Sequence, residues 1–248
     1  MILYLQMKAR ILLNNYEKRQ ALKEKYGNER VLCVDTSKFK YIDDLEAIDG
    51  YIKLITLYGT FYYRYDVEND DTKKQIIPYI VLKSGNKYMF AKRLKGDSRL
   101  VGGYTIGMGG HVDYSDLAMD GVHIDATNTL ENCVGRELNE ETTIDLDGIL
   151  NFKVADCFID ESNDVSKVHA CVLYVMELSD TDVTIKETDK LEAQWLTINQ
   201  ITDEMYESME GWSKIAYKIL FGKRKKKTKS EAKREAIQLA AQEVKSEH

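Results

Sequence analysis

The chain has 248 residues, of which 44% are hydrophobic and 31% are charged, so it can bury a globular core as one large domain or as one domain with appendages. No run of about 18 uncharged apolar residues occurs, and the sequence therefore predicts no membrane-spanning helix. The net charge of −6 is unevenly distributed. Residues 223–248 contain nine Lys or Arg and four Asp or Glu, a net charge of +5, so the rest of the chain carries −11. An acidic body of this kind argues against broad binding to a polyanion such as duplex DNA.

The first seventy residues predict two helices and one short strand. Apolar residues recur at helical spacing over 3–26, and Gly27 follows as a stop signal. The apolar run 31–34 is typical of a strand, and 43–58 has the pattern of a second helix. Residues 61–71 end in an acidic turn. Amphipathic helices of this kind permit packing on the core or self-association as a homodimer, and the sequence does not choose between the two.

A hairpin opens the next part of the chain. Residues 75–82 form an apolar strand, 84–87 have the composition of a tight turn, and 88–93 form the partner strand. Pro78 is the only proline, and it predicts an edge or irregular position because proline has no N–H for a strand ladder. Residues 104–108 then lead into a glycine-rich turn.

The remaining elements alternate in type. They are a helix over 129–142 with Asn128 or Thr129 as its N-cap, strands over 151–159 and 167–177, a short element that begins at 195–197, and a closing helix over 212–220. This order predicts an α+β fold in which a mixed sheet lies between helices, an α/β/α sandwich.

Three glutamates on the 129–142 helix carry the strongest chemical signal. Glu137, Glu140 and Glu141 are related by i, i+3 and i+4, which places their carboxylates on one helix face. Like charges at that spacing destabilise an isolated helix, whereas clustered hard oxygens are what Mg²⁺ or Mn²⁺ prefers. For such a motif alone, a solvated helix face is the commoner interpretation.

The context of these glutamates resembles the Nudix box. Gly107-Met108-Gly109-Gly110-His111 leads through a loop to Arg136-Glu137-Leu138-Asn139-Glu140-Glu141, with Ile144 at the later apolar position. Two further segments are similar to the family, 75–82 and Trp195-Leu196-Thr197. The likeness covers about 70–220. It implies a Nudix domain over 71–222, an N-terminal extension over 1–70, and a basic, helical or disordered tail over 223–248.

The resemblance also implies an activity. It suggests an Mg²⁺-dependent pyrophosphohydrolase, with Mn²⁺ as the alternative ion, in which water attacks one phosphorus of a nucleoside diphosphate derivative. By the same resemblance Glu137, Glu140 and Glu141 are metal ligands, and Gly109 offers its backbone carbonyl. Arg136 pairs with a carboxylate and holds the loop against the helix. The substrates implied are ADP-ribose, NAD(H), nucleotide sugars, dinucleoside polyphosphates or (d)NTPs.

The general base and the phosphate contacts stay open at this level. In the family the base is a box glutamate or an acid in a later loop, and here that loop offers Glu187, Asp189 and Glu192. Spacing does not choose among them. Arg93 and Lys92, at the end of the second hairpin strand, would contact substrate phosphates or would be exposed cations at a strand end.

Two departures from the box favour an alternative function. Asn128 stands at the upstream acidic position, so Arg136 would lack its usual partner, and Thr143 stands where a glycine usually leaves the helix. These changes suggest a nucleotide sensor without catalysis. The basic run at 223–229 suggests a third class, action on RNA 5′ ends, although such a run is usually a solvated tail.

The cysteines and the N-terminus indicate a compartment. Cys33, Cys133, Cys157 and Cys171 show no paired spacing, so free thiols are favoured over disulfides or zinc. The first residues lack the order of a signal peptide. We therefore expect a cytoplasmic protein. Among the histidines, His111 is expected to support the long loop, whereas His123 and His169 have no partner at metal-ligand spacing and are expected to be ordinary residues.

Overall fold

The computed structural model describes residues 2–41, 47–95, 101–186 and 188–222, and for part of the first helix it describes the backbone alone. The helices are α1 (Ile2–Tyr26), α2 (Ala47–Tyr58), α3 (Arg64–Val67), α4 (Ala126–Glu141), α5 (Asp203–Glu207) and α6 (Gly211–Phe221). The strands are β1 (Arg30–Asp35), β2 (Thr60–Tyr63), β3 (Lys73–Ser84), β4 (Lys87–Arg93), β5 (Tyr104–Thr105), β6 (Met108–Gly109), β7 (Met119–Asp120), β8 (His123–Ile124), β9 (Ile149–Phe158), β10 (His169–Leu178) and β11 (Leu191–Thr197).

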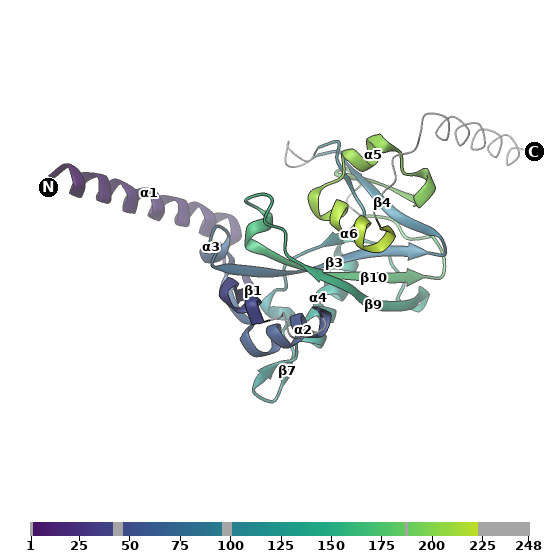
Figure 1. Cartoon of the computed structure of the whole chain (residues 1–248), viewed down its shortest axis with the longest axis horizontal. Coiled ribbons are helices and arrows are strands. Elements are labelled where there is room, and N and C mark those ends of the chain that lie inside the picture. The colour runs from purple at the N-terminus through teal and green to yellow at the C-terminus, as the bar shows by residue number, and fades with distance from the viewer. Residues whose placement is uncertain (1, 42–46, 96–100, 187, 223–248) are drawn as a thin grey trace, which may run out of the picture.

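One mixed sheet organises the fold, as the sequence predicts. Its main path runs β11-β4-β3-β1-β2, with β10 along the other edge of β3 and β9 beyond β10. The β3–β10 pair is parallel, and the other pairs in this sheet are antiparallel. Helices α5 and α6 lie on one face, and α2 and α4 lie on the other (Figure 1). This arrangement confirms the α/β/α sandwich, because each sheet face is apolar and needs a helical layer to cover it.

Strand β3 lies inside the sheet. On the side away from β10 its partner changes along the strand, from β1 to β6 and then to β4. Pro78 lies between the β1 and β6 pairings, so the irregular position expected for it is confirmed, although the strand is not an edge. Strand β4 diverges from β3 beyond the hairpin, and residues 104–109 enter the fork, with β5 against β4 and β6 against β3.

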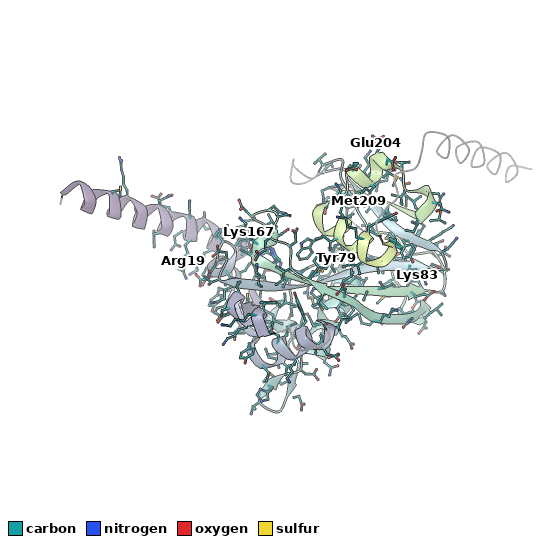
Figure 2. The ribbon with its side chains drawn as sticks, in the orientation of Figure 1. Arg19, Tyr79, Lys83, Lys167, Glu204 and Met209 are labelled. Carbon is teal, nitrogen blue, oxygen red and sulfur yellow. The ribbon has the colours of Figure 1, made fainter. Side chains whose placement is uncertain are left out.

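Two apolar cores flank the sheet. Ile80 and Leu130 belong to the core on the α4 side, whereas Val81 and Ala216 belong to the core on the α6 side. Neighbouring residues of β3 thus serve opposite cores, as the alternation of side chains along a strand requires. Figure 2 shows Tyr79 and Met209 on the α6 side of the sheet, where both are buried.

The N-terminal segment contributes directly to the sheet. Strand β1 pairs with β3, and β2 pairs with β1. Helix α1 points away from the body at its N-terminal end (Figure 1), and its last turns are held by an Arg19–Asp66 ion pair of 2.6 Å. The division of the chain at residue 70 stays a prediction, but part of the segment before it is built into the same sheet.

Several expectations are corrected or extended. Helix α4 begins three residues before the predicted start, β11 begins at Leu191 instead of near Trp195, and the segment before α4 contains the small β7–β8 hairpin. The four thiols are free and buried, as predicted. No helix in the described part of the chain is long and apolar enough to cross a membrane. Residues 43–46 of the second predicted helix and the basic run at 223–229 lie outside the described residues.

Candidate active site

An aspartate fixes where the glutamate-bearing helix begins. Asp125 is the N-cap of α4, and its Oδ1 accepts a hydrogen bond of 3.1 Å from the backbone N–H of Asn128. The two predicted caps lie inside the helix, where the Asn128 side-chain amide donates to Asp125 Oδ2 at 2.6 Å. Asp125 is favoured at the N-cap because its carboxylate can accept hydrogen bonds from the unpaired backbone N–H groups of the first helical turn. Asn128 therefore supports the cap rather than Arg136.

The three predicted metal ligands differ in their environments. The Glu137 side chain is 10% exposed, whereas that of Glu140 is 57% exposed. Burial raises the pKa of Glu137 above its ordinary value, and Arg136 opposes that shift. Glu141 ends the helix and forms part of the wall of a cavity in the fork of the sheet. The helix thus presents one buried, one solvated and one cavity-lining carboxylate.

Arg136 has a carboxylate partner that the sequence analysis missed. Its Nε and Nη2 donate to the two oxygens of Asp116 at 3.0 and 2.9 Å, and its Nη1 donates to Glu137 Oε1 at 2.7 Å and less closely to Glu140 at 3.4 Å. Hydrogen bonding to Asp116 is the main cause that raises the pKa of Arg136. Arg136 thus pairs with a carboxylate, as expected, and an acid from the loop replaces the one absent at Asn128.

Asp116 is held in place by its own turn. It ends a short 3₁₀ turn (Tyr114–Asp116), and its Oδ2 accepts the backbone N–H of Asp113 at 2.9 Å. Asp113 in turn caps the same segment through Ser115. The Asp113-x-x-Asp116 spacing is a capping pattern that could have marked this turn in the sequence. Arg136 Nη2 also donates to the carbonyl of His111 at 2.9 Å, which ties the glycine segment to the helix.

Close backbone approach explains the glycines before the helix. A Cβ atom at Gly110 would overlap the carboxylate of Glu137, and a Cβ at Gly109 would overlap the carbonyl of Pro78. The clash at Gly109 cannot be relieved by a small shift because its neighbour is strand backbone, whereas the clash at Gly110 would displace the Glu137 carboxylate from its hydrogen bond with Arg136. These positions therefore need glycine for space, and the glutamate lies directly against the loop.

Tyr79 anchors the glycine segment from the other side. Its buried hydroxyl lies 2.8 Å from Thr105 Oγ1 and 2.9 Å from Ser213 Oγ, and it accepts the N–H of Gly107 at 3.1 Å. Burial raises the pKa of Tyr79 to about 12, so the phenol stays protonated. The hydroxyl thus links β3, the loop and α6 in one network. This residue was part of a predicted strand and carried no functional signal.

A cavity of about 630 Å³ opens in the fork between β3 and β4. Gly109 and Glu141 line it near the helix, and Tyr79, His169 and Trp212 line it on the α6 side. Its size is within the range of small-molecule sites. The predicted catalytic helix and an aromatic wall therefore belong to one hollow, which the sequence did not indicate.

His169, which lines the cavity, lies against His111. The two Nε2 atoms are 3.2 Å apart, and His169 Nδ1 lies 2.6 Å from the carbonyl oxygen of Val165. The Val165 carbonyl accepts from Nδ1–H, which leaves His169 Nε2 as the acceptor for His111 in the neutral pair. Burial lowers the pKa of both rings, that of His111 well below its ordinary value. Sequence spacing offered no partner for His169, because the two residues are far apart in sequence and only the fold brings them together.

Trp212 is the least satisfied group of the wall. Its Nε1 is buried and has no hydrogen-bond partner among the described residues. A buried unpaired donor costs about 1–3 kcal/mol relative to a satisfied one. From the sequence, Trp212 was predicted only to begin the closing helix, with no role in a cavity.

The two predicted phosphate contacts lie on opposite faces of β4. Arg93 lines the cavity, and its Nε donates to Glu210 Oε1 at 2.9 Å. Lys92 is absent from the described cavity wall, and its Nζ lies 5.9 Å from the ring centroid of Tyr104. A role for either residue with phosphate stays a prediction.

The acids predicted as general bases are dispersed. Asp189 is 68% exposed, with Lys95 Nζ at 3.8 Å, and Glu192 lies within β11 opposite Lys92. Glu187 lies outside the described residues. Within the described wall of the cavity, Glu141 is the predicted acid that the structure places there.

The donor set fits a hard divalent cation. Three carboxylates and a glycine carbonyl are the oxygen ligands that Mg²⁺ takes, and the buried charge of Glu137 would be offset by a cation. In the structure Arg136 neutralises Glu137 and Glu140. Across the described residues, no three His, Cys, Asp or Glu side chains gather closely enough to form a metal cluster. The metal assignment thus rests on donor chemistry and on the resemblance.

Comparisons with known proteins identify the family. No family model matches the chain. Protein YmaB of Bacillus subtilis is 30% identical over 161 residues, which cover 63% of this chain and 76% of YmaB. The crystal structure of Tm1382, described as a candidate Nudix hydrolase, superposes with a TM-score of 0.63 at 26% identity over 77% of this chain and 98% of Tm1382. The NUDIX domain of Shewanella oneidensis NrtR is a more distant likeness, with a TM-score of 0.43, 15% identity, and coverage of 59% and 86%.

The likeness to Tm1382 extends over nearly the whole of that chain and over about three quarters of this one. The chain belongs to the Nudix hydrolases, a superfamily of pyrophosphohydrolases.

Proposed function

We propose that the chain is a divalent-cation-dependent hydrolase of the diphosphate linkage in a nucleoside diphosphate derivative. The observation that carries this proposal is the position of α4. Its carboxylates lie against the glycine segment, and Glu141 and Gly109 together line the cavity in the fork of the sheet. A diphosphate at this end would meet the acidic helix, and the attached organic group would occupy the rest of the cavity.

The charged residues of the α4 motif have distinct roles in this proposal. Glu137, Glu140 and Glu141 would hold Mg²⁺ or Mn²⁺ together with the carbonyl of Gly109. The bound ion supplies charge neutralisation on the phosphate oxygens and lowers the pKa of the attacking water. Arg136 orients Glu137 and is itself oriented by Asp116, so the first carboxylate is fixed before substrate binds.

The proton acceptor is best sought at Glu141. It lies at the end of α4 and in the cavity wall, so it is placed between the helix and the organic group. Asp189 is highly exposed, and Glu192 lies within strand β11. Glu187, the remaining candidate, stays a prediction.

The two departures from the box lend less support to a sensor without catalysis. Asp116 supplies the carboxylate that Asn128 does not. Thr142 leaves the helix in an extended conformation, with φ −131° and ψ 167°, and no described non-glycine residue has a positive φ. A glycine at position 143 is therefore not required by the backbone.

A matched pair of variants tests the proposal. Hydrolysis would be measured with Mg²⁺ or Mn²⁺ over ADP-ribose, NAD(H), nucleotide sugars, dinucleoside polyphosphates and (d)NTPs, for wild type, Glu140→Gln and Glu131→Gln. Glu131 is an exposed glutamate on the opposite side of the same helix. Metal-dependent turnover that is lost in Glu140→Gln and kept in Glu131→Gln supports the enzyme. Absence of turnover, with a nucleotide still raising the melting temperature, would instead support a sensor.

A further inference from the structure

The two N-terminal strands hold a tyrosine of the long loop. In the β1–β2 pair Leu32 lies opposite Phe61, and Arg30 is two residues before Leu32, so Arg30 and Phe61 project from the same face. The guanidinium carbon of Arg30 lies 3.4 Å from the ring centroid of Tyr114, and the Phe61 ring meets that ring edge-to-face at 5.2 Å and 89°. A cation over the ring and a perpendicular ring against it together restrict how the Tyr114 side chain can turn.

Backbone hydrogen bonds join the same part of the loop to β1. The N–H of Leu32 donates to the carbonyl of Val112 at 2.9 Å, and Val31 forms an antiparallel bridge with Asp113. Residues 112 and 113 follow the glycine segment directly. Strand β1 therefore fixes the backbone immediately before Tyr114.

Tyr114 belongs to the turn that positions Asp116. Residues 114–116 form one 3₁₀ turn, which is closed by two hydrogen bonds of 2.9 Å between Asp113 and Asp116. Asp116 then holds Arg136, which donates to Glu137. Tyr114 is 43% exposed, so its ring lies outside the apolar cores and is kept in place by contacts at the surface. An unbroken series of contacts thus runs from β1 and β2 to the first carboxylate of α4.

We propose that Arg30 and Phe61 are positioning residues for the active site, because they clamp Tyr114 in place. The clamp holds the turn that presents Asp116 to Arg136, and Arg136 in turn orients the first carboxylate of α4. The segment before residue 70 is then part of the active site instead of an appendage. This inference rests on the proposed function only for its effect on hydrolysis, since the clamp is a property of the protein without metal or substrate.

Hydrogen exchange tests the clamp without turnover. In the metal-free protein we expect Arg30→Met to speed amide exchange over 112–118 by about 3–5-fold, because the cation over the ring is lost and local opening becomes easier. Lys38→Met is the matched control, since Lys38 also lies over a ring, that of Tyr58 at 4.7 Å, but outside the loop. It should leave exchange over 112–118 unchanged. Unchanged exchange in Arg30→Met would overturn the clamp.

A pair of substitutions separates the ring from the hydroxyl. Tyr114→Phe keeps the ring that Arg30 and Phe61 contact and should exchange and react as wild type does. Tyr114→Leu removes the ring, and it should lower kcat/KM about 5–10-fold in a protein that still folds, as melting temperatures show. Equal losses in Tyr114→Phe and Tyr114→Leu would show that the contacts of the ring are not what matters.

A double-mutant cycle distinguishes positioning from a general loss of stability. If the clamp acts through Asp116, Tyr114→Leu should lower kcat/KM less than about 2-fold in an Asp116→Asn protein, because that route is already broken. An equal loss in both backgrounds overturns the inference and leaves the hydrolase standing. Faster exchange in Arg30→Met, in a chain whose wild type hydrolyses no substrate, overturns the proposed function and leaves the clamp standing.

Discussion

Arg136 on helix α4 and Asp116 in the preceding loop form an ion pair through two hydrogen bonds, of 3.0 and 2.9 Å. The Asp116 side chain is 4% exposed, so this pair is shielded from water on the aspartate side. The same guanidinium donates to Glu137 and to the carbonyl of His111. One arginine therefore couples the long loop, the glycine segment and the first carboxylate of the proposed metal site.

Removing the charge of Asp116 should impair the site without touching substrate. We expect Asp116→Asn to lower hydrolysis by about 10–100-fold, because partners that orient ligating groups have effects of that size. The variant should also melt at a lower temperature, since Arg136 would be left with one buried partner fewer. Asp120→Asn, an exposed aspartate in the β7–β8 hairpin, is the matched control. Equal rates for Asp116→Asn and Asp120→Asn would contradict the coupling through Arg136.

Two glycines that differ in their surroundings give a steric test. In Gly110→Ala the new Cβ would overlap the Glu137 carboxylate, so both metal-dependent activity and stability should fall. In Gly135→Ala the new methyl meets nothing within 4 Å on the exposed face of α4. That change should raise the free energy of unfolding by about 0.5–1 kcal/mol, because alanine is the better helix former. Thermal melts and initial rates of both variants check the pair, and full activity in Gly110→Ala would show that Glu137 need not lie against the loop.

The buried histidines predict how stability depends on pH. Burial lowers the pKa of His169 in the folded protein below its ordinary value of 6.5. As the pH falls below about 6.5, the unfolded chain therefore binds a proton that the folded chain does not. The stabilising contribution is present above this pH and is lost below it, with a slope of up to about 1.4 kcal/mol per pH unit for one proton.

Substitution of His169 isolates this effect. We expect His169→Gln to show a shallower fall in stability between about pH 6.5 and pH 5 than wild type, whatever its stability at pH 8. His123→Gln, in which an exposed histidine is replaced, should keep the wild-type slope. Denaturant unfolding at several pH values measures the slopes. Parallel curves for wild type and His169→Gln would rule out a contribution from this ring.

Mg²⁺ should stabilise the folded chain through the acidic helix. A ligand that binds only the folded state at 100 times its Kd adds about 2.7 kcal/mol to the free energy of unfolding. Glu137→Gln should lose most of this gain, because the variant retains the shape of the side chain but lacks the charge. Glu131→Gln should keep it. Melting temperatures with and without Mg²⁺ provide the comparison, and an identical gain in Glu137→Gln would place the cation elsewhere.

Local patterns in the sequence were sufficient to predict most of the helices and strands and the resemblance to the family. The period of the apolar residues predicted the β3–β4 hairpin, the strands β9 and β10, and the helices α1 and α6, because these segments bury one face against the core. The Arg136-Glu137 motif also lay within a correctly predicted helix. The spacing of carboxylates on one helical turn is a local property, so it can be predicted without knowledge of the fold.

Only the tertiary structure decided which distant residues meet. Asp116 replaces the acid missing at Asn128, His111 lies beside His169, and Trp212 reaches the cavity shared with Glu141. Each of these contacts joins different elements, and the cavity exists because β3 and β4 diverge around residues 104–109. Sequence spacing carries no measure of that divergence. The sequence by itself therefore determined the chemistry of α4, whereas the packing of the sheet and its helices decided the partners that orient it and the shape of the cavity beside it.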